Sequence, residues 1–185
     1  MNRIVRDFKQ AQKLKDHLAV VVGAGRSGLS AARLLLALGA RVRLADANPD
    51  LPPEVRDRFG PEVEIVTGEH LPEHFRDADI VVLSPGVAVR RLGRALNAVP
   101  ERKVVAELEL ASWFVEAPIV AVTGTNGKTT TCTLISRILA EAGKKVFTGG
   151  NIGTPLCQYL LEDEPAEVLV LEASSFQLQN CRLFK

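Results

Sequence analysis

The strongest constraint on the fold is an alternation of short apolar runs with helical patterns, which repeats along most of the sequence. The first unit consists of LAVVVG, SGLSAARLLLALG and ARVRLAD, which predict a strand, a helix and a second strand. Further strands are predicted over residues 63–68, 79–86 and 103–107, and a helix over residues 90–98. Alternation of this kind predicts an α/β fold with a mainly parallel sheet and helices on both faces.

A second series of the same kind begins near residue 117. A strand over residues 118–122 leads into a glycine-rich loop and a helix over residues 128–142. KKVFTGGNIG, TPLCQYLLED and AEVLVLEAS then predict a strand, a helix and a strand. We therefore predict two domains: a Rossmann-like domain over residues 1–116 and part of a P-loop ATPase-type α/β domain over residues 117–185. Because three strands leave a parallel sheet with unprotected edges, we expect the chain to be a fragment of a longer protein.

Composition excludes several classes of partner. Lys and Arg number 23 against 22 Asp and Glu, so the net charge of +1 predicts neither nucleic acid nor an anionic membrane as a partner. Residues 1–18 are too charged for a secretory signal, and no apolar run approaches the length of a membrane span, so a cytoplasmic location is expected.

The cysteines and histidines do not indicate a metal site. The three cysteines are far apart and form no C-x-x-C pair, so neither a zinc site nor a disulfide framework is predicted. His70 and His74 have metal-ligand spacing, but Pro72 lies between them and the H-E-x-x-H order is absent. A solvated loop or a helix start is the better interpretation.

The first glycine-rich turn, GAGRSG, directly follows a predicted strand and opens a helix. Gly23 would permit the tight turn, Gly25 would let a diphosphate approach the backbone, and Gly28 would allow close packing of the helix on the strand. Asp46, at the end of the next strand, is placed to accept a hydrogen bond from a ribose hydroxyl. A dinucleotide site of a dehydrogenase, another ribose-diphosphate site and glycines used only for packing all remain open, because such a turn does not read the base.

The second glycine-rich turn, TGTNGKTT, also lies between a strand and a helix, as a P-loop does. Backbone amides and Lys128 would hold ATP phosphates, and the Thr129 hydroxyl would reach Mg²⁺. The turn departs from G-x-x-x-x-G-K-[ST], because Val122 stands at the first glycine position and Gly124 takes over the turn. The alternative is a G-K-T-T that occurs in a loop by chance.

Two further polar residues follow predicted strands of the second series. Asn151 in GGNIG and Glu172 in VLVLEASSFQL are both expected at the carboxyl edge of the sheet, beside the P-loop. A glutamate there can hold Mg²⁺ directly or through water. The alternative is that Glu172 has only a structural role as a capping residue beside Ser174.

Taken together, GTNGKTT, GGNIG and LEASSFQL resemble the ATP-dependent muramyl ligases of peptidoglycan synthesis, and the resemblance covers essentially the whole chain. SSFQL, LSPG and GAGRSG point to the members that add D-glutamate. The resemblance implies that the N-terminal domain binds the UDP end of a substrate rather than NAD. The substrate-binding residues that it implies are Gly25, Arg26, Ser27, Gly28, Asp46, Ala47, Ser84, Pro85, Gly86 and Asn151. The ATP-binding residues that it implies are Gly124, Thr125, Asn126, Gly127, Lys128, Thr129 and Thr130. It also implies Mg²⁺ at Thr129 and Glu172, and catalytic roles for Lys128, Glu172 and Asn151.

The implied reaction joins D-glutamate to UDP-N-acetylmuramoyl-L-alanine in an ADP-forming amide ligation. ATP would phosphorylate the alanine carboxylate to an acyl phosphate, which the amine of D-glutamate would attack. The family's downstream metal-binding histidine, modified lysine and C-terminal domain have no counterpart before residue 185, so we expect no activity from the chain alone. No protein partner is predicted. An NAD-dependent oxidoreductase and a pure nucleotide-binding module remain the alternatives.

Overall fold

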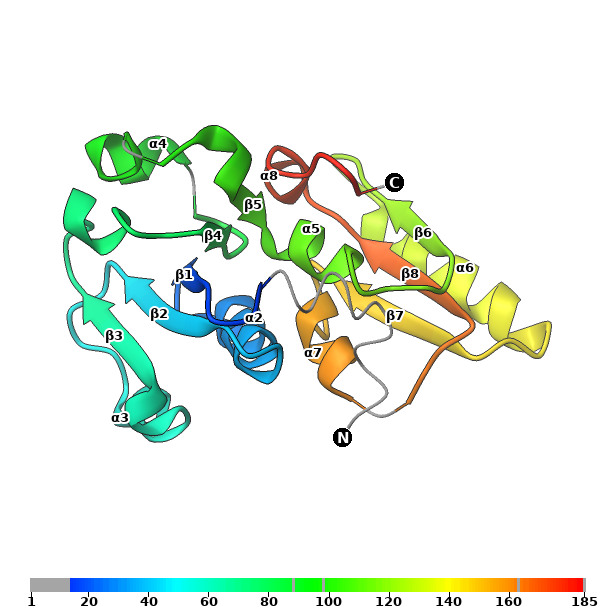
Figure 1. Ribbon diagram of the computed structural model, residues 1–185. Coiled ribbons are helices and arrows are strands. Elements are labelled where there is room, and N and C mark those ends of the chain that lie inside the picture. The colour runs from blue at the N-terminus through cyan, green and yellow to red at the C-terminus, as the bar shows by residue number, and fades with distance from the viewer. Residues whose placement is uncertain (1–13, 88, 98, 163, 185) are drawn as a thin grey trace.

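The computed structural model describes residues 14–184 except 88, 98 and 163, and it contains two parallel β-sheets joined by helices (Figure 1). The charged segment 1–18 and the end of the helix predicted over residues 90–98 lie partly outside the described residues. Every strand pair in both sheets is parallel. The prediction of an α/β fold with parallel sheets is confirmed.

The first sheet has the strand order β3-β2-β1-β4-β5. Its strands are β1 (Leu18–Val22), β2 (Arg41–Asp46), β3 (Val63–Thr67), β4 (Ile80–Leu83) and β5 (Val104–Ala106). All five residues of β1, LAVVV, are buried, as expected for a central strand covered on both faces. The chain moves from β1 outward to β3, then returns to the other side of β1 with β4. A crevice is therefore expected outside the carboxyl ends of β1 and β4, where ligands of open α/β sheets bind.

The second sheet has three strands in the order β6-β8-β7. They are β6 (Ile119–Val122), β7 (Val146–Gly150) and β8 (Val168–Glu172). Because β8 is central and parallel to both neighbours, its last residue lies between Val122 and Gly150 in the register. The loops that follow these three strands therefore emerge at one edge.

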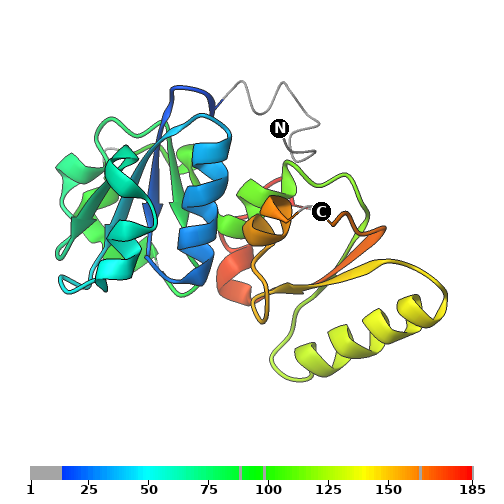
Figure 2. The ribbon, with the colours of Figure 1, turned by 90° about the horizontal axis from the view of Figure 1, so that it is seen from below.

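Helices fill the space between the two sheets and cover their outer faces. The α-helices are α2 (Arg26–Ala37), α3 (Pro53–Asp57), α4 (Val89–Leu92), α5 (Glu107–Ser112), α6 (Lys128–Glu141), α7 (Leu156–Leu161) and α8 (Ser175–Leu178). The 3₁₀-helices are η1 (Gly60–Glu62), η2 (Pro72–His74), η3 (Gly93–Leu96) and η4 (Glu101–Lys103). Figure 2 shows α2 on the side of the first sheet that faces the second, with α5 and α7 between them and α6 on the far side of the second sheet.

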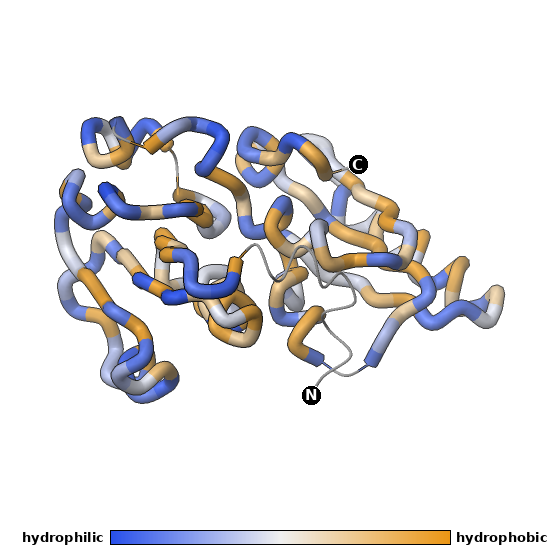
Figure 3. The backbone as a smooth tube through the Cα atoms, in the orientation of Figure 1, coloured by the Kyte–Doolittle hydropathy of each residue, from blue (hydrophilic) through white to orange (hydrophobic). Residues whose placement is uncertain are grey.

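One hydrophobic core runs across both sheets. It includes Leu34 and Leu35 of α2, Leu110 of α5, and Leu156 and Leu160 of α7. A second core, built around Phe75 and the short helices α4 and η3, covers the opposite face of the first sheet. In Figure 3 the segment of α7, whose place is labelled in Figure 1, carries hydrophobic colour. The two sheets are thus held together by shared apolar packing.

The elements that differ from the predictions are short. The helix predicted over residues 90–98 is divided between α4 and the 3₁₀-helix η3, and α3, α5 and α8 were not predicted. α3, α5 and α8 have four to six residues and complete fewer than two turns, which is too short for periodicity alone to establish a helix. The domain boundary at 116/117 falls between α5 and β6 and stays a prediction. Within the described residues, no helix combines the length and apolarity that a membrane span requires.

Candidate functional site

The TGTNGKTT turn connects β6 to the amino end of α6. Gly124 and Gly127 have φ values of +142° and +78°, conformations that a side chain disfavours. Helix α6 begins at Lys128, directly after Gly127. The free backbone N–H groups of the first turn of this long helix therefore lie beside the loop, where they favour an anion.

Lys128 folds back over the loop from which it emerges. Its Nζ donates to the carbonyl oxygen of Gly124 at 2.9 Å and to that of Thr125 at 3.4 Å. These carbonyls hold the ammonium group directly above the turn. A phosphate bound at the turn would meet this positive charge as well as the helix amides.

Glu172 lies at the centre of a cluster formed by three separate segments. Its Oε2 accepts a hydrogen bond from Thr129 Oγ1 at 2.7 Å, and its Oε1 accepts one from Asn151 Nδ2 at 3.3 Å. The side chain is nearly buried, with 4% of the residue exposed. The structure therefore brings together three residues that the sequence predicted for one site.

The loop after β7 is fixed tightly against β8. Asn151 N donates to the carbonyl oxygen of Glu172 at 2.7 Å. A Cβ on Gly150 would lie 2.5 Å from that same oxygen, and the φ of Gly150 is +104°. Only glycine fits this approach, so Asn151 is held at a constant position relative to Glu172.

The donor set of this cluster fits Mg²⁺. A carboxylate and a hydroxyl supply oxygen ligands, and Mg²⁺ commonly takes one or two protein oxygens together with phosphates and water. No cluster of three or more His, Cys, Asp or Glu able to hold a metal occurs in the part of the chain that the structure describes. The residues of the cluster thus suit a metal ion that is shared with a phosphate ligand.

The GAGRSG turn at the carboxyl end of β1 is packed as the spacing of its glycines predicts. A Cβ on Gly28 would lie 1.8 Å from the carbonyl oxygen of Gly23, so α2 can approach β1 only with glycine at this position. Ser84, which follows β4, donates its hydroxyl to the same Gly23 oxygen at 2.9 Å. A Cβ on Gly25, by contrast, would meet nothing within 4 Å. The space over Gly25 is therefore open to a ligand.

Asp46 supports this turn through its carboxylate. Its Oδ2 accepts from Ala24 N at 2.6 Å and its Oδ1 accepts from Asn48 N at 2.8 Å. Each oxygen keeps a lone pair that could accept from a ribose hydroxyl. That role stays a prediction, whereas the structural role of Asp46 is visible.

The other residues predicted around this turn lie at the same edge of the first sheet. Arg26 begins α2 and is exposed, Ala47 is exposed after β2, and Ser84–Pro85–Gly86 follow β4. Gly86 has a φ of +89°, so the chain turns sharply there. These residues border the switch point between β1 and β4, and their contact with a ligand stays a prediction.

His70 lies close enough to Asp46 to feel its charge, a contact that the sequence did not predict. Burial lowers the pKa of His70, an effect that the nearby Asp46 partly opposes.

Gln177, which follows β8, was also not singled out from the sequence. The side chain of Gln177 caps α8, with Oε1 accepting from Ser174 N at 2.9 Å. Its Nε2 is, within the described residues, the one buried side-chain polar atom without a hydrogen-bond partner. The S-x-x-Q spacing of a capping box signals the cap, but no pattern signals the unpartnered nitrogen.

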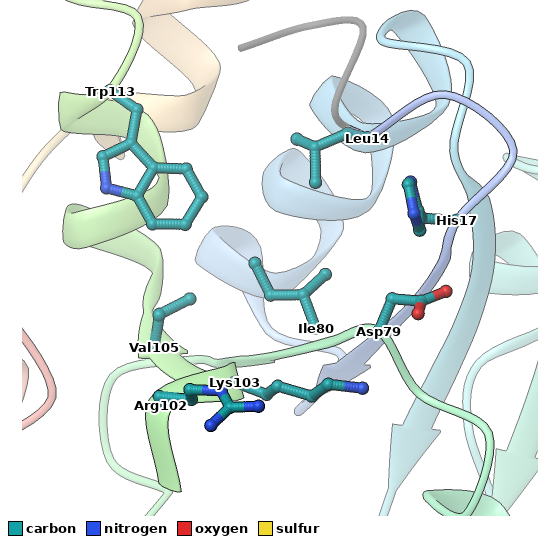
Figure 4. Close-up of a pocket in the computed structure, with 8 residues that line it drawn as sticks. All are labelled: Leu14, His17, Asp79, Ile80, Arg102, Lys103, Val105 and Trp113. Atoms are coloured by element: carbon teal, nitrogen blue, oxygen red, sulfur yellow. The ribbon is translucent and has the colours of Figure 1, made fainter. Parts of the chain in front are cut away.

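A separate pocket of about 330 Å³ lies at the amino ends of β1, β4 and β5 (Figure 4). Ile80, Val105 and Trp113 contribute apolar surface, and Arg102 adds a positive charge. Asp79, also in its lining, already accepts from Leu18 N at 3.0 Å. This pocket is at the opposite edge of the first sheet from GAGRSG and contains none of the predicted residues.

The fold defines an α/β protein with two parallel sheets. Each sheet carries a glycine-rich turn at the carboxyl end of one of its strands, GAGRSG after β1 and TGTNGKTT after β6. Residues 17–104 match the family "Mur ligase MurD-like, N-terminal domain", and residues 122–185 match the family "Mur ligase middle domain". The chain belongs to the Mur ligase family.

Curated relatives carry a more specific name. Proteins named "UDP-N-acetylmuramoylalanine--D-glutamate ligase" from Nitratidesulfovibrio vulgaris (strain DP4) and Desulfovibrio desulfuricans are 53% and 51% identical over 172 and 174 residues. These matches cover 91% and 90% of this chain, but the chain spans only 40% and 39% of those relatives. Among solved structures, a pseudomurein peptide ligase type C from Methanothermus fervidus matches with a TM-score of 0.46 at 26% identity, covering 89% of this chain and 36% of that chain.

Proposed function

We propose that this chain belongs to an ATP-dependent ligase that joins D-glutamate to UDP-N-acetylmuramoyl-L-alanine in the synthesis of peptidoglycan precursors. The proposal is supported by the name of the relatives, whose sequences match nine-tenths of the chain. The observation that carries it is the Thr129–Glu172–Asn151 cluster beside the Lys128 loop. A second glycine-rich turn on the other sheet then suits a second phosphate-bearing substrate.

The second sheet would bind ATP. Gly124–Thr130 would surround the phosphates, and the Lys128 ammonium would compensate charge on the phosphoryl group as it moves to the substrate carboxylate. Lys128 would leave its carbonyl partners, Gly124 and Thr125, to do so. Thr129 and Glu172 would hold Mg²⁺, which when bound neutralises phosphate charge. Asn151 would contact the muramoyl side of the substrate.

The first sheet would bind the UDP end of the substrate. The open space over Gly25 and the amino end of α2 would take the diphosphate, with Arg26 and Ser27 beside it. Asp46 and Ala47 would face the uridine. The Ser84–Pro85–Gly86 turn would line the uracil or the adjoining sugar.

The chemistry proposed for the reaction has two steps. An oxygen of the alanine carboxylate attacks the γ-phosphorus of ATP, and ADP leaves with the electrons of the broken P–O bond. The amine of D-glutamate then attacks the acyl carbon, loses a proton and displaces phosphate. The residues described here serve the first step by placing and neutralising charge.

The alternative of an NAD-dependent oxidoreductase is not favoured, because both family matches are to Mur ligases. A direct test of the proposal is the binding of Mg²⁺·ATP to the chain and to two variants. Lys128→Ala should weaken this binding and Gly25→Ala should leave it unchanged. Equal weakening by both variants, or binding that does not depend on Mg²⁺, would contradict the assignment of ATP to the second sheet.

A further inference from the structure

Helix α5 carries two acidic side chains that are almost completely buried between the sheets. Glu107 and Glu109 are each only 1% exposed, although α5 directly follows β5 and is the last element before the second sheet. A buried carboxylate is costly unless several donors satisfy it. Their partners therefore indicate what these residues hold in place.

Glu109 accepts hydrogen bonds from four N–H groups. Three belong to consecutive backbone amides: Arg182 N reaches Oε2 at 3.0 Å, Leu183 N lies 3.1 Å from Oε1 and 3.2 Å from Oε2, and Phe184 N reaches Oε2 at 3.0 Å. The fourth is the indole N–H of Trp113, 3.0 Å from Oε1. One side chain thus fastens the segment Arg182–Phe184 to the end of the first sheet.

Further contacts fasten Arg182 and the nearby Asn180 to the first sheet. Ala106 N, at the end of β5, donates to the carbonyl oxygen of Asn180 at 3.1 Å. Arg182 Nη2 donates to the carbonyl oxygen of Glu101 at 2.8 Å. The segment lies ten residues after Glu172 and is reached from it through α8, which also contacts α5.

Glu107 holds the chain segment that follows β7, as Glu109 holds the segment that follows β8. Its Oε1 accepts from Cys157 N, at the start of α7, at 2.7 Å. The preceding loop contains Asn151 and is closed by a bond from Gly150 N to the carbonyl oxygen of Thr154 at 2.9 Å. The chain segments that follow Asn151 and Glu172 are thus each anchored to α5.

We propose that Glu109 is a positioning residue that fixes the candidate ATP site on the second sheet relative to the candidate substrate site on the first, with Glu107 as a second anchor. This inference rests on the proposed function, because the reaction requires the γ-phosphate of one ligand to meet the carboxylate of the other. The residues proposed for ATP lie on the second sheet, and those proposed for the UDP end of the substrate lie on the first, whereas Asn151, proposed for the muramoyl side, follows β7 of the second sheet. Loss of the anchor therefore alters the approach of the two ligands and leaves the ATP site and the UDP-binding residues intact.

The test compares Glu109→Gln with Glu141→Gln, which makes the same chemical change at an exposed position of α6. A glutamine side chain keeps one oxygen that can accept hydrogen bonds, but it replaces the other oxygen with an NH₂ group. This NH₂ group cannot accept from the N–H groups that the oxygen bound, so at least part of the anchor is lost. Hydrogen exchange should become about tenfold faster or more at Arg182–Phe184. Exchange in β8 should stay as in the parent chain, which distinguishes release of the anchor from general unfolding.

The functional measurement uses the ligase that contains these residues. Glu109→Gln should lower kcat by about 10- to 100-fold, the scale expected for a small misplacement of reactants. The separate affinities for ATP and for UDP-N-acetylmuramoyl-L-alanine should stay within a few-fold of the parent values. Glu141→Gln should change neither quantity. Within the 185-residue chain Trp113 is the single tryptophan, so in that chain its fluorescence reports directly on the environment of Glu109.

The outcomes separate this inference from the proposed function. Release of Arg182–Phe184 with an unchanged kcat overturns the positioning role, and so does unchanged exchange in that segment. A parent protein without ligase activity would instead overturn the proposed function, while the exchange measurement would still decide whether Glu109 anchors the segment. If Glu109→Gln does not fold, Glu109→Asp, which keeps the charge but shortens the side chain, provides the same comparison.

Discussion

The Thr129 hydroxyl donates a hydrogen bond of 2.7 Å to the Glu172 carboxylate, although the two residues are 43 positions apart in the sequence. The parallel pairing of β6 with β8 brings them together, because Val122 and Glu172 are partners in the register. One oxygen pair therefore joins the amino end of α6 to the carboxyl end of the central strand. This pair is where we expect Mg²⁺ to be held.

Replacing Glu172 with glutamine should weaken the response of ATP binding to Mg²⁺. The amide oxygen can still accept from Thr129, so the fold should be kept, but the negative charge that attracts the cation is removed. We expect the Mg²⁺ affinity of the ATP complex to fall by at least about tenfold. Calorimetric titration with Mg²⁺ at saturating ATP measures this. The exposed Glu141→Gln variant serves as the control, and equal Mg²⁺ affinity in both variants would exclude Glu172 as a ligand.

Lys128→Ala should affect turnover much more than binding of the UDP substrate. The ammonium group is expected to interact more strongly with the phosphoryl group in the transition state than in bound ATP. Loss of one such contact costs about 10²–10³ in rate. Phosphate release by the ligase that contains these residues is the measurement. Near-normal turnover in Lys128→Ala would show that GTNGKTT has only a structural role.

Gly25 and Gly28 form a matched pair that separates ligand binding from packing. A Cβ on Gly28 would collide with the Gly23 carbonyl oxygen at 1.8 Å, so Gly28→Ala should lower the free energy of unfolding by about 1–3 kcal/mol. Gly25 has φ −75° and ψ 178° and no neighbour within 4 Å of a Cβ. Because Gly25 is also the N-cap of α2, where alanine is less favourable than glycine, the entropic gain from Gly25→Ala is opposed and the net change in the free energy of unfolding should stay within about 1 kcal/mol.

Gly25→Ala is expected to affect the binding of the ligand rather than the stability of the fold. A methyl group on Gly25 would occupy the space through which a diphosphate approaches, so Gly25→Ala should lose affinity for the UDP substrate while it remains folded. Urea unfolding and substrate titration of both variants provide the measurements. Undiminished affinity in a stable Gly25→Ala protein would place the diphosphate elsewhere.

The titration of Glu107 should lower the free energy of unfolding as the pH rises above 4.5, the ordinary pKa of its carboxyl group. Burial raises the pKa of Glu107 above its ordinary value of 4.5, although the hydrogen bond from Cys157 N opposes this. Between 4.5 and the raised pKa, the folded protein binds more protons than the unfolded chain, so the free energy of unfolding decreases with increasing pH across that window. Above the raised pKa the effect of Glu107 is constant.

Glu107→Gln removes this titration and keeps an oxygen that can accept from Cys157 N. Relative to the parent chain, the variant should therefore gain stability as the pH rises from 4.5 towards neutral. Urea unfolding at a series of pH values measures the difference. A difference that does not change with pH would mean that Glu107 is ionised to the same extent in both states.

The sequence predicted the parts of this fold that depend on local patterns. The β1 run LAVVV and the long helix α6 have clear periodicity, and the loops after them have glycines at characteristic spacing. Asn151 and Glu172 were correctly placed together because parallel strands end at one edge of a sheet. The assignment of ligands to these residues stays a prediction.

The contacts between the sheets could not be predicted in this way. Glu107 and Glu109 lie in a charged-looking segment, ELELAS, whose short helix shows no period, and both would ordinarily be expected at the surface. Their burial depends on amides from Cys157 and from Arg182–Phe184, which lie 50 to 75 residues away in the chain. The second role of Asp46, as an acceptor for Ala24 N, likewise depends on the packing of a strand against a turn.

The most direct test of the account is calorimetric titration of the chain with UDP-N-acetylmuramoyl-L-alanine, with NAD titrated in parallel under the same conditions. Both ligands carry a ribose and a diphosphate, so the comparison asks which nucleotide the GAGRSG turn and the Ser84–Pro85–Gly86 turn accept together. We expect the UDP substrate to bind with the higher affinity and Gly25→Ala to abolish that binding. Equal or tighter binding of NAD would contradict the assignment of the first sheet to a ligase substrate.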